Sequence, residues 1–210
     1  MSNNGTTALH PNDSFYNILD MIYDDQREEH SHHVFKNRFN REYKHANNVS
    51  HYCEQIAIRM YTNNNPLIFK VRIAGFLHDI GKSKIDEKIL NTPGSLSEEE
   101  WFEIKKHPEI GAKMMGFSNR YENVLDIKMA IYQHHERLNG SGYPLGIKGD
   151  QIILPARIIA VADSFDAMTN KRVYQKEYSV HDALYEIKKQ AGILYDPAVV
   201  DCFCDYIRSP

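Results

Sequence analysis

Residues 73–82, with the sequence IAGFLHDIGK, join an apolar helical pattern to a polar turn. Pro66 fits the first turn of a helix, and apolar residues at helical spacing continue that helix into this segment. Gly81 ends the helix directly after the adjacent residues His78 and Asp79. The segment therefore predicts an apolar helix that ends on two side chains able to bind a metal ion.

Helical periodicity marks most of the remaining chain, whereas the alternating pattern of a strand is scarce. A capping-box spacing of Ser97 and Glu100 indicates a further helix start. Residues 139–149 contain four glycines and one proline, which indicates a loop. The sequence therefore predicts an all-α fold, a compact helical bundle with one glycine-rich loop. The expected helices lie at residues 13–27, 42–61, 66–79, from 97, 121–136, 155–168, 180–189 and 197–207.

Composition restricts the classes of protein to which the chain can belong. Its 210 residues suffice for one domain with a core, and a net charge of −3 gives no general attraction to nucleic acid or to an anionic membrane. Three cysteines form no disulfide framework, which indicates a reducing compartment. No apolar run has the length of a membrane span, and residues 1–14 lack the apolar centre of a signal peptide. We expect a soluble, cytoplasmic protein.

Side chains that bind metals occur at five places along the chain, two of which are adjacent pairs. Adjacent residues on a helix point about 100° apart, so one member of a pair can bind an ion while the other reaches a second ion. Imidazole and carboxylate together favour Fe, Mn, Zn or Ni over Ca or Mg. These residues are His45, the pair His78 and Asp79, His107, the pair His134 and His135, and Asp163.

Each of these residues also has an ordinary structural interpretation. A lone histidine is more often a hydrogen-bonded helix residue than a metal ligand. Asp163 is harder to explain in that way, because it follows the apolar run 158–162 and a buried carboxylate is costly unless it is paired or metal-bound. Lys82 either meets a phosphate beside the metals or complements the carboxyl end of a helix at the surface.

Several motifs resemble those of one known family. Residues 78–82, HDIGK, are similar to the HD signature of metal-dependent phosphohydrolases, and residues 134–144, HHERLNGSGYP, are similar to the second signature of the HD-GYP subfamily. Residues 106–111, 162–169 and 195–197 are also typical of that subfamily. The resemblance extends over residues 42–207. It implies an HD-type helical bundle, which we assign to residues 41–210, preceded by an N-terminal helical extension at residues 1–40.

The resemblance also implies an activity and a site. Active members hydrolyse the bacterial second messenger cyclic di-GMP to linear pGpG and often on to GMP, and some act on cyclic GMP-AMP. The implied cofactors are two divalent transition-metal ions, Fe or Mn first and Zn or Ni as alternatives, with a third ion left open. The implied metal ligands are His45, His78, Asp79, His107, His134, His135 and Asp163, with Asp79 bridging. Asp79 and Lys82 are the implied catalytic residues, and Lys82, Tyr143 and Arg172 the implied substrate contacts.

The implied reaction follows from charge. Two divalent ions about 3.5–4 Å apart lower the pKa of a bridging water and stabilise the attacking and leaving oxygens. The resulting hydroxide would attack phosphorus in line with the ribose leaving oxygen, while Lys82 and Arg172 offset the developing charge. Tyr143 would stack on a base or bond to a phosphate, since the glycines around it let the loop backbone approach the substrate.

Some positions depart from the subfamily pattern. Members with three metals carry a glutamate four residues before the first histidine, where this chain has Arg41, with Glu42 one residue later. We therefore expect two metals. Ala46 replaces the usual serine, and Asn48 replaces the usual arginine. Residues 172–175, RVYQ, lack the last basic residue of the family's Arg-Pro-Tyr-(Arg or Lys) segment, so one substrate contact is missing.

Three readings of the function remain open. The first is a cyclic di-GMP phosphodiesterase, and the second is a phosphohydrolase for cyclic GMP-AMP or another nucleotide phosphate ester. The third is a cyclic dinucleotide receptor with weak or no catalysis. All three expect a cyclic dinucleotide or related ligand, and neither a nucleic acid polymer nor a membrane as partner. Residues 1–40 contain no recognisable sensor or receiver domain, so we expect control through a homodimer or a separate regulatory protein.

Overall fold

The computed structural model describes residues 29–61, 64–115, 124–170 and 178–209, with the side chains of residues 29–42, 124 and 125 left aside. The helix expected at residues 13–27 and the segment 172–175 lie outside this part, so both stay predictions. In the described ranges the chain is helical and contains no strand, which confirms the all-α prediction. None of the helices there is both long enough and apolar enough to cross a bilayer.

The elements follow one another with short connections. They are α2 (Glu29–Met60), α3 (Asn65–Leu77), the 3-10 turn η1 (Ile80–Lys84), α4 (Glu87–Leu90), α5 (Glu98–Ile104), α6 (His107–Met114), α7 (Val124–Gln133), the 3-10 turn η3 (Gly149–Gln151), α8 (Leu154–Thr169), α9 (Val180–Lys189) and α10 (Pro197–Arg208).

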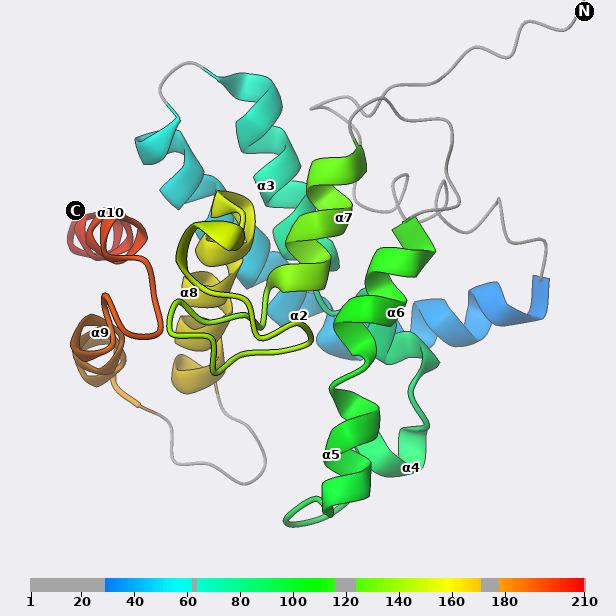
Figure 1. Cartoon of the computed structure of the whole chain (residues 1–210). Coiled ribbons are helices and arrows are strands. Elements are labelled where there is room, and N and C mark those ends of the chain that lie inside the picture. Colours follow the sequence, from blue (N-terminus) through cyan, green and yellow to red (C-terminus); the bar gives the residue numbers. More distant parts are fainter. Residues whose placement is uncertain (1–28, 62–63, 116–123, 171–177, 210) are drawn as a thin grey trace, which may run out of the picture.

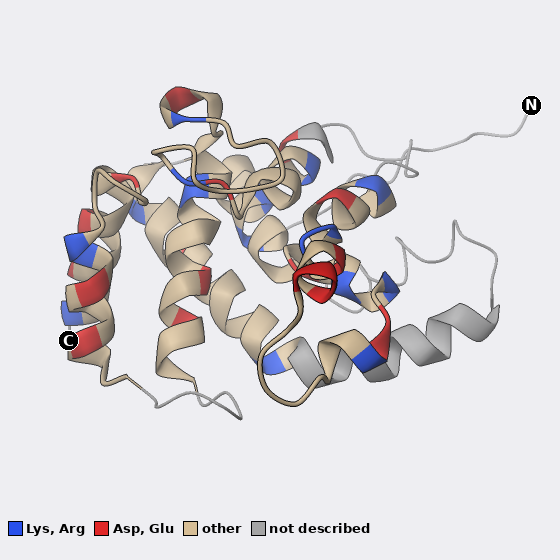
Figure 2. Cartoon of the chain, turned by 60° about the horizontal axis from the view of Figure 1, so that its bottom comes forward, with Lys and Arg blue, Asp and Glu red and all other residues tan. Residues whose placement is uncertain are grey.

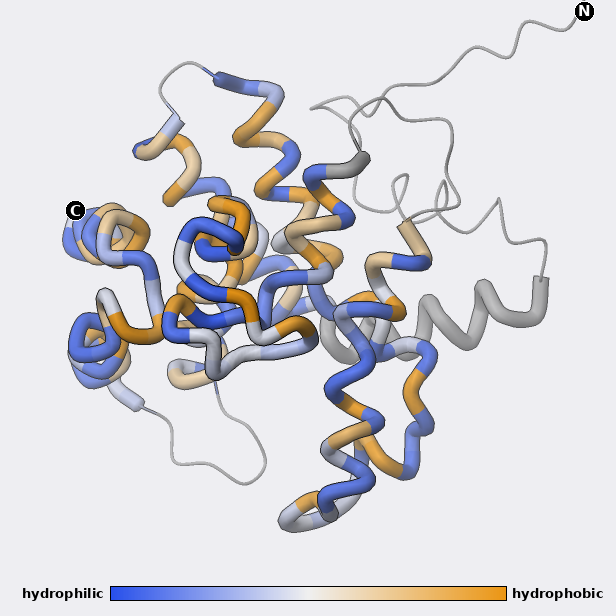
Figure 3. The backbone as a smooth tube through the Cα atoms, viewed as in Figure 1, coloured by the Kyte–Doolittle hydropathy of each residue, from blue (hydrophilic) through white to orange (hydrophobic). Residues whose placement is uncertain are grey.

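The long helix α2 runs through the middle of the bundle and contacts α3, α8 and α10 (Figure 1). α7 completes the centre by packing against α3, α6 and α8. The most apolar stretches lie in α3, α7 and α8, as Figure 3 shows. Their buried side chains form one core with the inner face of α2, in which Val49, Phe76 and Ile158 are fully shielded from solvent.

Two of the expected boundaries were wrong. α2 begins at Glu29 rather than at residue 42, because residues 29–41 carry few apolar side chains and show little periodicity in the sequence. The helix that starts at Ser97 does not reach His107, since α5 ends at Ile104 and a new helix begins at His107 with Pro108 in its first turn. The division at residues 40 and 41 falls inside α2 and stays a prediction.

Local sequence signals explain how the elements near the site begin and end. The predicted capping box is confirmed, because the Ser97 hydroxyl accepts from the Glu100 N–H at 3.2 Å and the Glu100 carboxylate accepts from the Ser97 N–H at 2.8 Å. α3 opens with Pro66 and ends at Leu77, as its sequence predicted. His78 and Asp79 therefore stand at the carboxyl end of a buried helix, where η1 turns the chain towards α6.

Candidate metal centre

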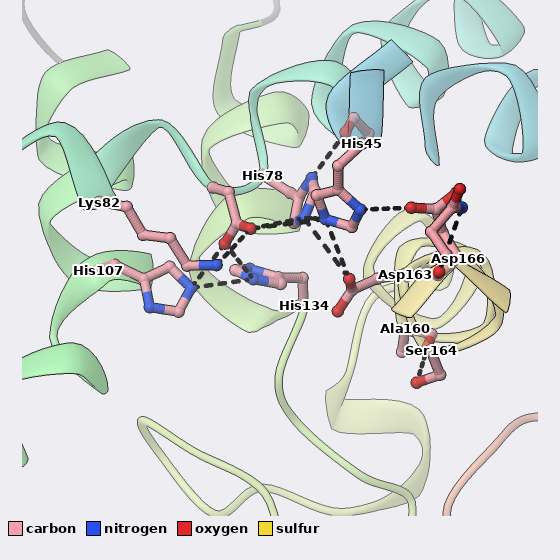
Figure 4. A network of polar contacts seen from close by, with 12 residues as sticks. His45, His78, Lys82, His107, His134, Ala160, Asp163, Ser164 and Asp166 are labelled. Atoms are coloured by element: carbon pink, nitrogen blue, oxygen red, sulfur yellow. Dashed lines mark hydrogen bonds and ion pairs between the residues drawn. The ribbon is translucent and has the colours of Figure 1, made fainter. Parts of the chain in front are cut away.

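The side chains predicted to bind metal come together from five places in the bundle (Figure 4). His45 lies on α2, His78 and Asp79 follow α3, His107 begins α6, His134 and His135 follow α7, and Asp163 lies on α8. Among the described residues they form two groups, whose ligand atoms lie within 4.8 Å of one another. Group one is Asp79, His107, His134 and His135; group two is His45, His78 and Asp163.

The backbone orients three of the histidines in the same way. In each, Nδ1 lies at hydrogen-bond distance from the carbonyl oxygen three residues earlier, at the end of a helix or turn. Nδ1 is therefore the protonated nitrogen, and Nε2 keeps its lone pair and faces the site. The pairs are His78 with Gly75 at 2.8 Å, His107 with Ile104 at 2.7 Å and His134 with Ile131 at 2.7 Å.

These lone pairs lie close together without a proton to share. The Nε2 atoms of His107 and His134 are 3.3 Å apart, and both rings are buried. Oδ1 of Asp79 lies 3.1 Å from Nε2 of His107, is itself buried and has no hydrogen-bond donor among the described residues. Three electron-rich atoms that face one another in a buried site fit a bound cation, and this nitrogen and oxygen set suits a divalent transition metal.

The carboxylate of Asp79 lies between the two groups. Its Oδ1 faces His107, whereas its Oδ2 lies 3.2 Å from Nε2 of His78 and 3.6 Å from Nε2 of His45. Nζ of Lys82 donates to the same Oδ2 at 2.6 Å. Burial disfavours the charged carboxylate, but Lys82 and then His78 hold the pKa of Asp79 well below its usual range. Asp79 is thus an anion with one oxygen towards each group.

A second carboxylate holds His45 in place from behind. Oδ2 of the buried Asp166 lies 2.6 Å from Nδ1 of His45, which leaves Nε2 facing Asp163 at 3.4 Å. Oδ1 of Asp166 accepts hydrogen bonds from the side-chain amides of Asn48 at 2.8 Å and Asn170 at 2.6 Å. Asp166 is thereby fixed on three sides and orients the His45 ring.

The charge around His45 comes from three carboxylates. Burial of the ring favours its neutral form, but hydrogen bonds with Asp163, Asp166 and Asp79 raise the pKa of His45 to about 11. The buried rings of group one lack such partners. Burial, and the neighbouring rings of His135 and His78, hold the pKa of His134 well below its usual range, so this ring is neutral and available as a ligand.

Asp166 was not singled out from the sequence, although the signal was present. It lies three residues after Asp163 on α8, so both carboxylates project from one side of a helix whose neighbouring residues are apolar. Its role depends on Asn48 and on His45, which are more than a hundred residues earlier in the chain.

Removing the Asp166 carboxylate is expected to weaken the site without emptying it. In an Asp166→Ala variant the His45 ring loses its orienting partner, so metal affinity and turnover should fall about 10–100-fold. Metal titration of the apo protein and steady-state kinetics would measure both effects, with Asp201→Ala on the exposed side of α10 as the matched control. Unchanged metal affinity in a folded Asp166→Ala protein would contradict this role.

The glycine-rich loop covers group one. Gly142 permits this, since a Cβ there would lie 2.4 Å from the carbonyl oxygen of His135. The Tyr143 ring stacks on the His135 ring with centroids 4.6 Å apart and planes inclined by 25°. Glu136 secures the loop from below, because its buried carboxylate accepts from the Leu145 N–H at 2.6 Å. Tyr143 is partly buried beside the site, and its substrate contact stays a prediction.

Other residues considered from the sequence lie elsewhere. Arg172 is outside the described residues, as are the side chains of Arg41 and Glu42, so the structure does not bear on a third metal or on an arginine contact. His51 lies 2.8 Å from the Tyr206 hydroxyl, away from the cluster.

Comparison with known proteins gives consistent matches. Residues 31–199 match a family model described as HD domain. A cyclic di-GMP phosphodiesterase of Thermotoga maritima is 42% identical over 136 residues, which cover 65% of this chain and 37% of that protein. A 3'3'-cGAMP-specific phosphodiesterase of Vibrio cholerae is 34% identical over 163 residues, covering 77% and 31%. The chain thus spans about a third of the length of these relatives.

Solved structures share the fold. A protein described as HDG"Y"P from Bdellovibrio bacteriovorus superimposes with a TM-score of 0.63 at 20% identity, over 80% of this chain and 52% of that one. A cyclic GMP-AMP specific phosphodiesterase of V. cholerae gives a TM-score of 0.60 at 22% identity, over 79% and 44%. At these identities the likeness concerns the helical fold and the arrangement of its elements.

Proposed function

Because this chain belongs to the HD domain family, with the motifs of its HD-GYP branch, we propose that it is a metal-dependent phosphodiesterase that hydrolyses cyclic di-GMP. Membership of the family implies binding of divalent metal ions. The observation that carries the proposal is the Asp79 carboxylate, whose two oxygens face two separate groups of ligand atoms. Two ions bridged by one carboxylate are the arrangement that in-line phosphoryl displacement requires.

The proposed ligands are the seven residues of the two groups, and we expect two ions, Fe or Mn first and Zn or Ni as alternatives. Ions bound there would supply positive charge to the phosphoryl oxygens and to the leaving oxygen. Lys82 lies at the rim of the site with its side chain 22% exposed, so its Nζ would donate to a phosphoryl oxygen while it keeps Asp79 ionised. Tyr143 and Arg172 are the proposed further contacts.

The proposed product is linear pGpG, with GMP after a second cleavage. The alternative substrate is cyclic GMP-AMP, which is favoured by the named activity of several relatives at 33–34% identity. We propose residues 41–210 as the catalytic domain, residues 1–40 as a helical extension, and the cytoplasm as the site of action. Control would come from a homodimer or a separate regulatory protein.

The test is turnover of cyclic di-GMP by protein prepared without oxygen and loaded with Fe(II) or Mn(II). Chromatography should show pGpG or GMP from the loaded protein, no product after chelation, and recovery when metal is returned, since the ions supply the charge for displacement. The same assay with 3'3'-cyclic GMP-AMP ranks the two substrates.

Two results would contradict the proposal. Fully metallated protein that leaves both cyclic dinucleotides intact but hydrolyses bis(4-nitrophenyl) phosphate would be a hydrolase for another phosphate ester. Metallated protein that binds cyclic di-GMP without any turnover would be a receptor.

A further inference from the structure

A lysine beside the metal centre lies over two aromatic rings. Nζ of Lys105 is 5.5 Å from the centre of the Tyr143 ring and 5.9 Å from the centre of the Trp101 ring. Trp101 and Lys105 are four residues apart at the end of α5, so they lie on one side of that helix. Trp101 leaves 48% of its surface exposed. A cation and an exposed indole therefore stand next to the glycine-rich loop.

This pair is continuous with the metal centre. Tyr143 stacks on His135, a member of group one, and Lys105 lies two residues before His107 of the same group. A row of side chains thus runs outward from His135 through Tyr143 and Lys105 to Trp101. Figure 1 shows the loop between α7 and α8 reaching towards the junction of α5 and α6.

The other side of α5 carries the opposite charge. There a pocket of about 440 Å³ is lined by Ile89, Phe102 and the acidic residues Glu98, Glu99, Glu100 and Glu103. In Figure 2 the first turn of α5 is coloured red by these residues. An anionic ligand is repelled from that side and is attracted to the side of Lys105.

A cyclic dinucleotide has two bases and two phosphodiesters, whereas the metal centre engages one phosphodiester at a time. The remaining nucleotide needs a cation for its phosphate and a flat apolar surface for its base. Aromatic side chains serve as stacking surfaces for bases of any kind, and a lysine supplies a mobile point charge for phosphate. Lys105 and Trp101 present these two features side by side.

We propose that Trp101, Lys105 and Tyr143 form the subsite for the second nucleotide of the cyclic dinucleotide, with a purine base stacked on Trp101 and its phosphate paired with Lys105. This subsite rests on the proposed function. It concerns substrate affinity rather than the bond-breaking step, because Lys105 and Trp101 lie outside the two ligand groups.

Trp101 is the chain's single tryptophan and therefore reports on its own occupancy. The full chain carrying Asp79→Asn is titrated with cyclic di-GMP, so that ligand is bound without turnover. Saturable quenching of the tryptophan fluorescence is expected, with a Kd that calorimetry reproduces. GMP, which offers a single base and phosphate, should bind more weakly.

Variants separate stacking from general stability. Trp101→Ala and Lys105→Ala should each raise the Kd for cyclic di-GMP about tenfold, whereas Trp101→Phe keeps a ring and most of the affinity. Phe102→Ala is the matched control, because this exposed neighbour contacts Lys106 on the acidic side and should bind as the parent does. In chains with Asp79 intact, KM for cyclic di-GMP should rise at unchanged kcat, and hydrolysis of bis(4-nitrophenyl) phosphate should stay at the parental rate.

Each outcome is decisive. If the parent binds or hydrolyses cyclic di-GMP while Trp101→Ala and Lys105→Ala match Phe102→Ala, the subsite is wrong and the proposed function stands. If Trp101→Ala slows both substrates equally, its role is structural and the subsite is again overturned. If the parent neither binds nor hydrolyses a cyclic dinucleotide, both proposals are refuted.

Discussion

An Asp79→Asn variant is expected to lose at least about 10³-fold in kcat/KM for cyclic di-GMP, because the only carboxylate that faces both ligand groups becomes a neutral amide. One oxygen of Asp79 lies 3.1 Å from Nε2 of His107, and the other lies 3.2 Å from Nε2 of His78. An amide cannot place an anionic oxygen towards each group. Bound metal should therefore fall together with activity, and elemental analysis of the purified variant measures the first while product chromatography measures the second.

The matched control is Asp126→Asn, which makes the same chemical change in an exposed carboxylate that pairs with Lys70 on the surface. Exposed ion pairs contribute about 0–1 kcal/mol, so this variant should melt and turn over as the parent does. An Asp79→Asn protein with full metal content and parental activity would refute the assignment of Asp79 as the bridging residue.

A Gly81→Ala variant is expected to lose about 3 kcal/mol or more of its free energy of unfolding, together with the metal site. A Cβ at this position would lie 2.0 Å from the carbonyl oxygen of His107 and 2.6 Å from the backbone nitrogen of Gly111. Both are backbone atoms of α6, so the methyl group fits only if the whole helix moves. That movement would carry His107 away from Asp79. Urea denaturation and metal titration would measure the two losses.

Gly94→Ala is the control for the backbone itself. Gly94 has a φ of +95° and no atom within 4 Å of the added Cβ, so alanine there meets strain but no collision. It should cost about 1–2 kcal/mol and leave the activity of the folded protein unchanged. A Gly81→Ala protein as stable as Gly94→Ala would show that η1 and α6 do not pack as closely as described.

Much of the fold was predictable because its signals are local. The capping box at Ser97, the proline at the start of α3 and the periodicity of α9 each depend on residues within one or two turns, and the expected bounds of α9 agree with the structure. The prediction was wrong where local signals were weak or competed. Few apolar residues marked the beginning of α2, and the proline that restarts the helix at α6 was read as part of the helix before it.

The candidate site was predictable in its residues but not in its geometry. Spacing and motif resemblance identified all seven candidate ligands, and the structure brings them into two groups. That these residues bind metal stays a prediction. Neither the division into groups nor the position of Asp79 between them could be read from the sequence, because both depend on the angles at which five segments meet.

The sequence by itself determined the helical class, the chemistry of the donor set and the family, since residue type, helical period and motif spacing are properties of neighbouring residues. Only the tertiary structure decided which distant side chains meet. The contact of Asp166 with His45 joins positions 121 residues apart, and Lys105 lies between Trp101 and Tyr143 because α5 and the glycine-rich loop pack side by side. Such contacts arise from the packing of whole helices, which no local pattern encodes.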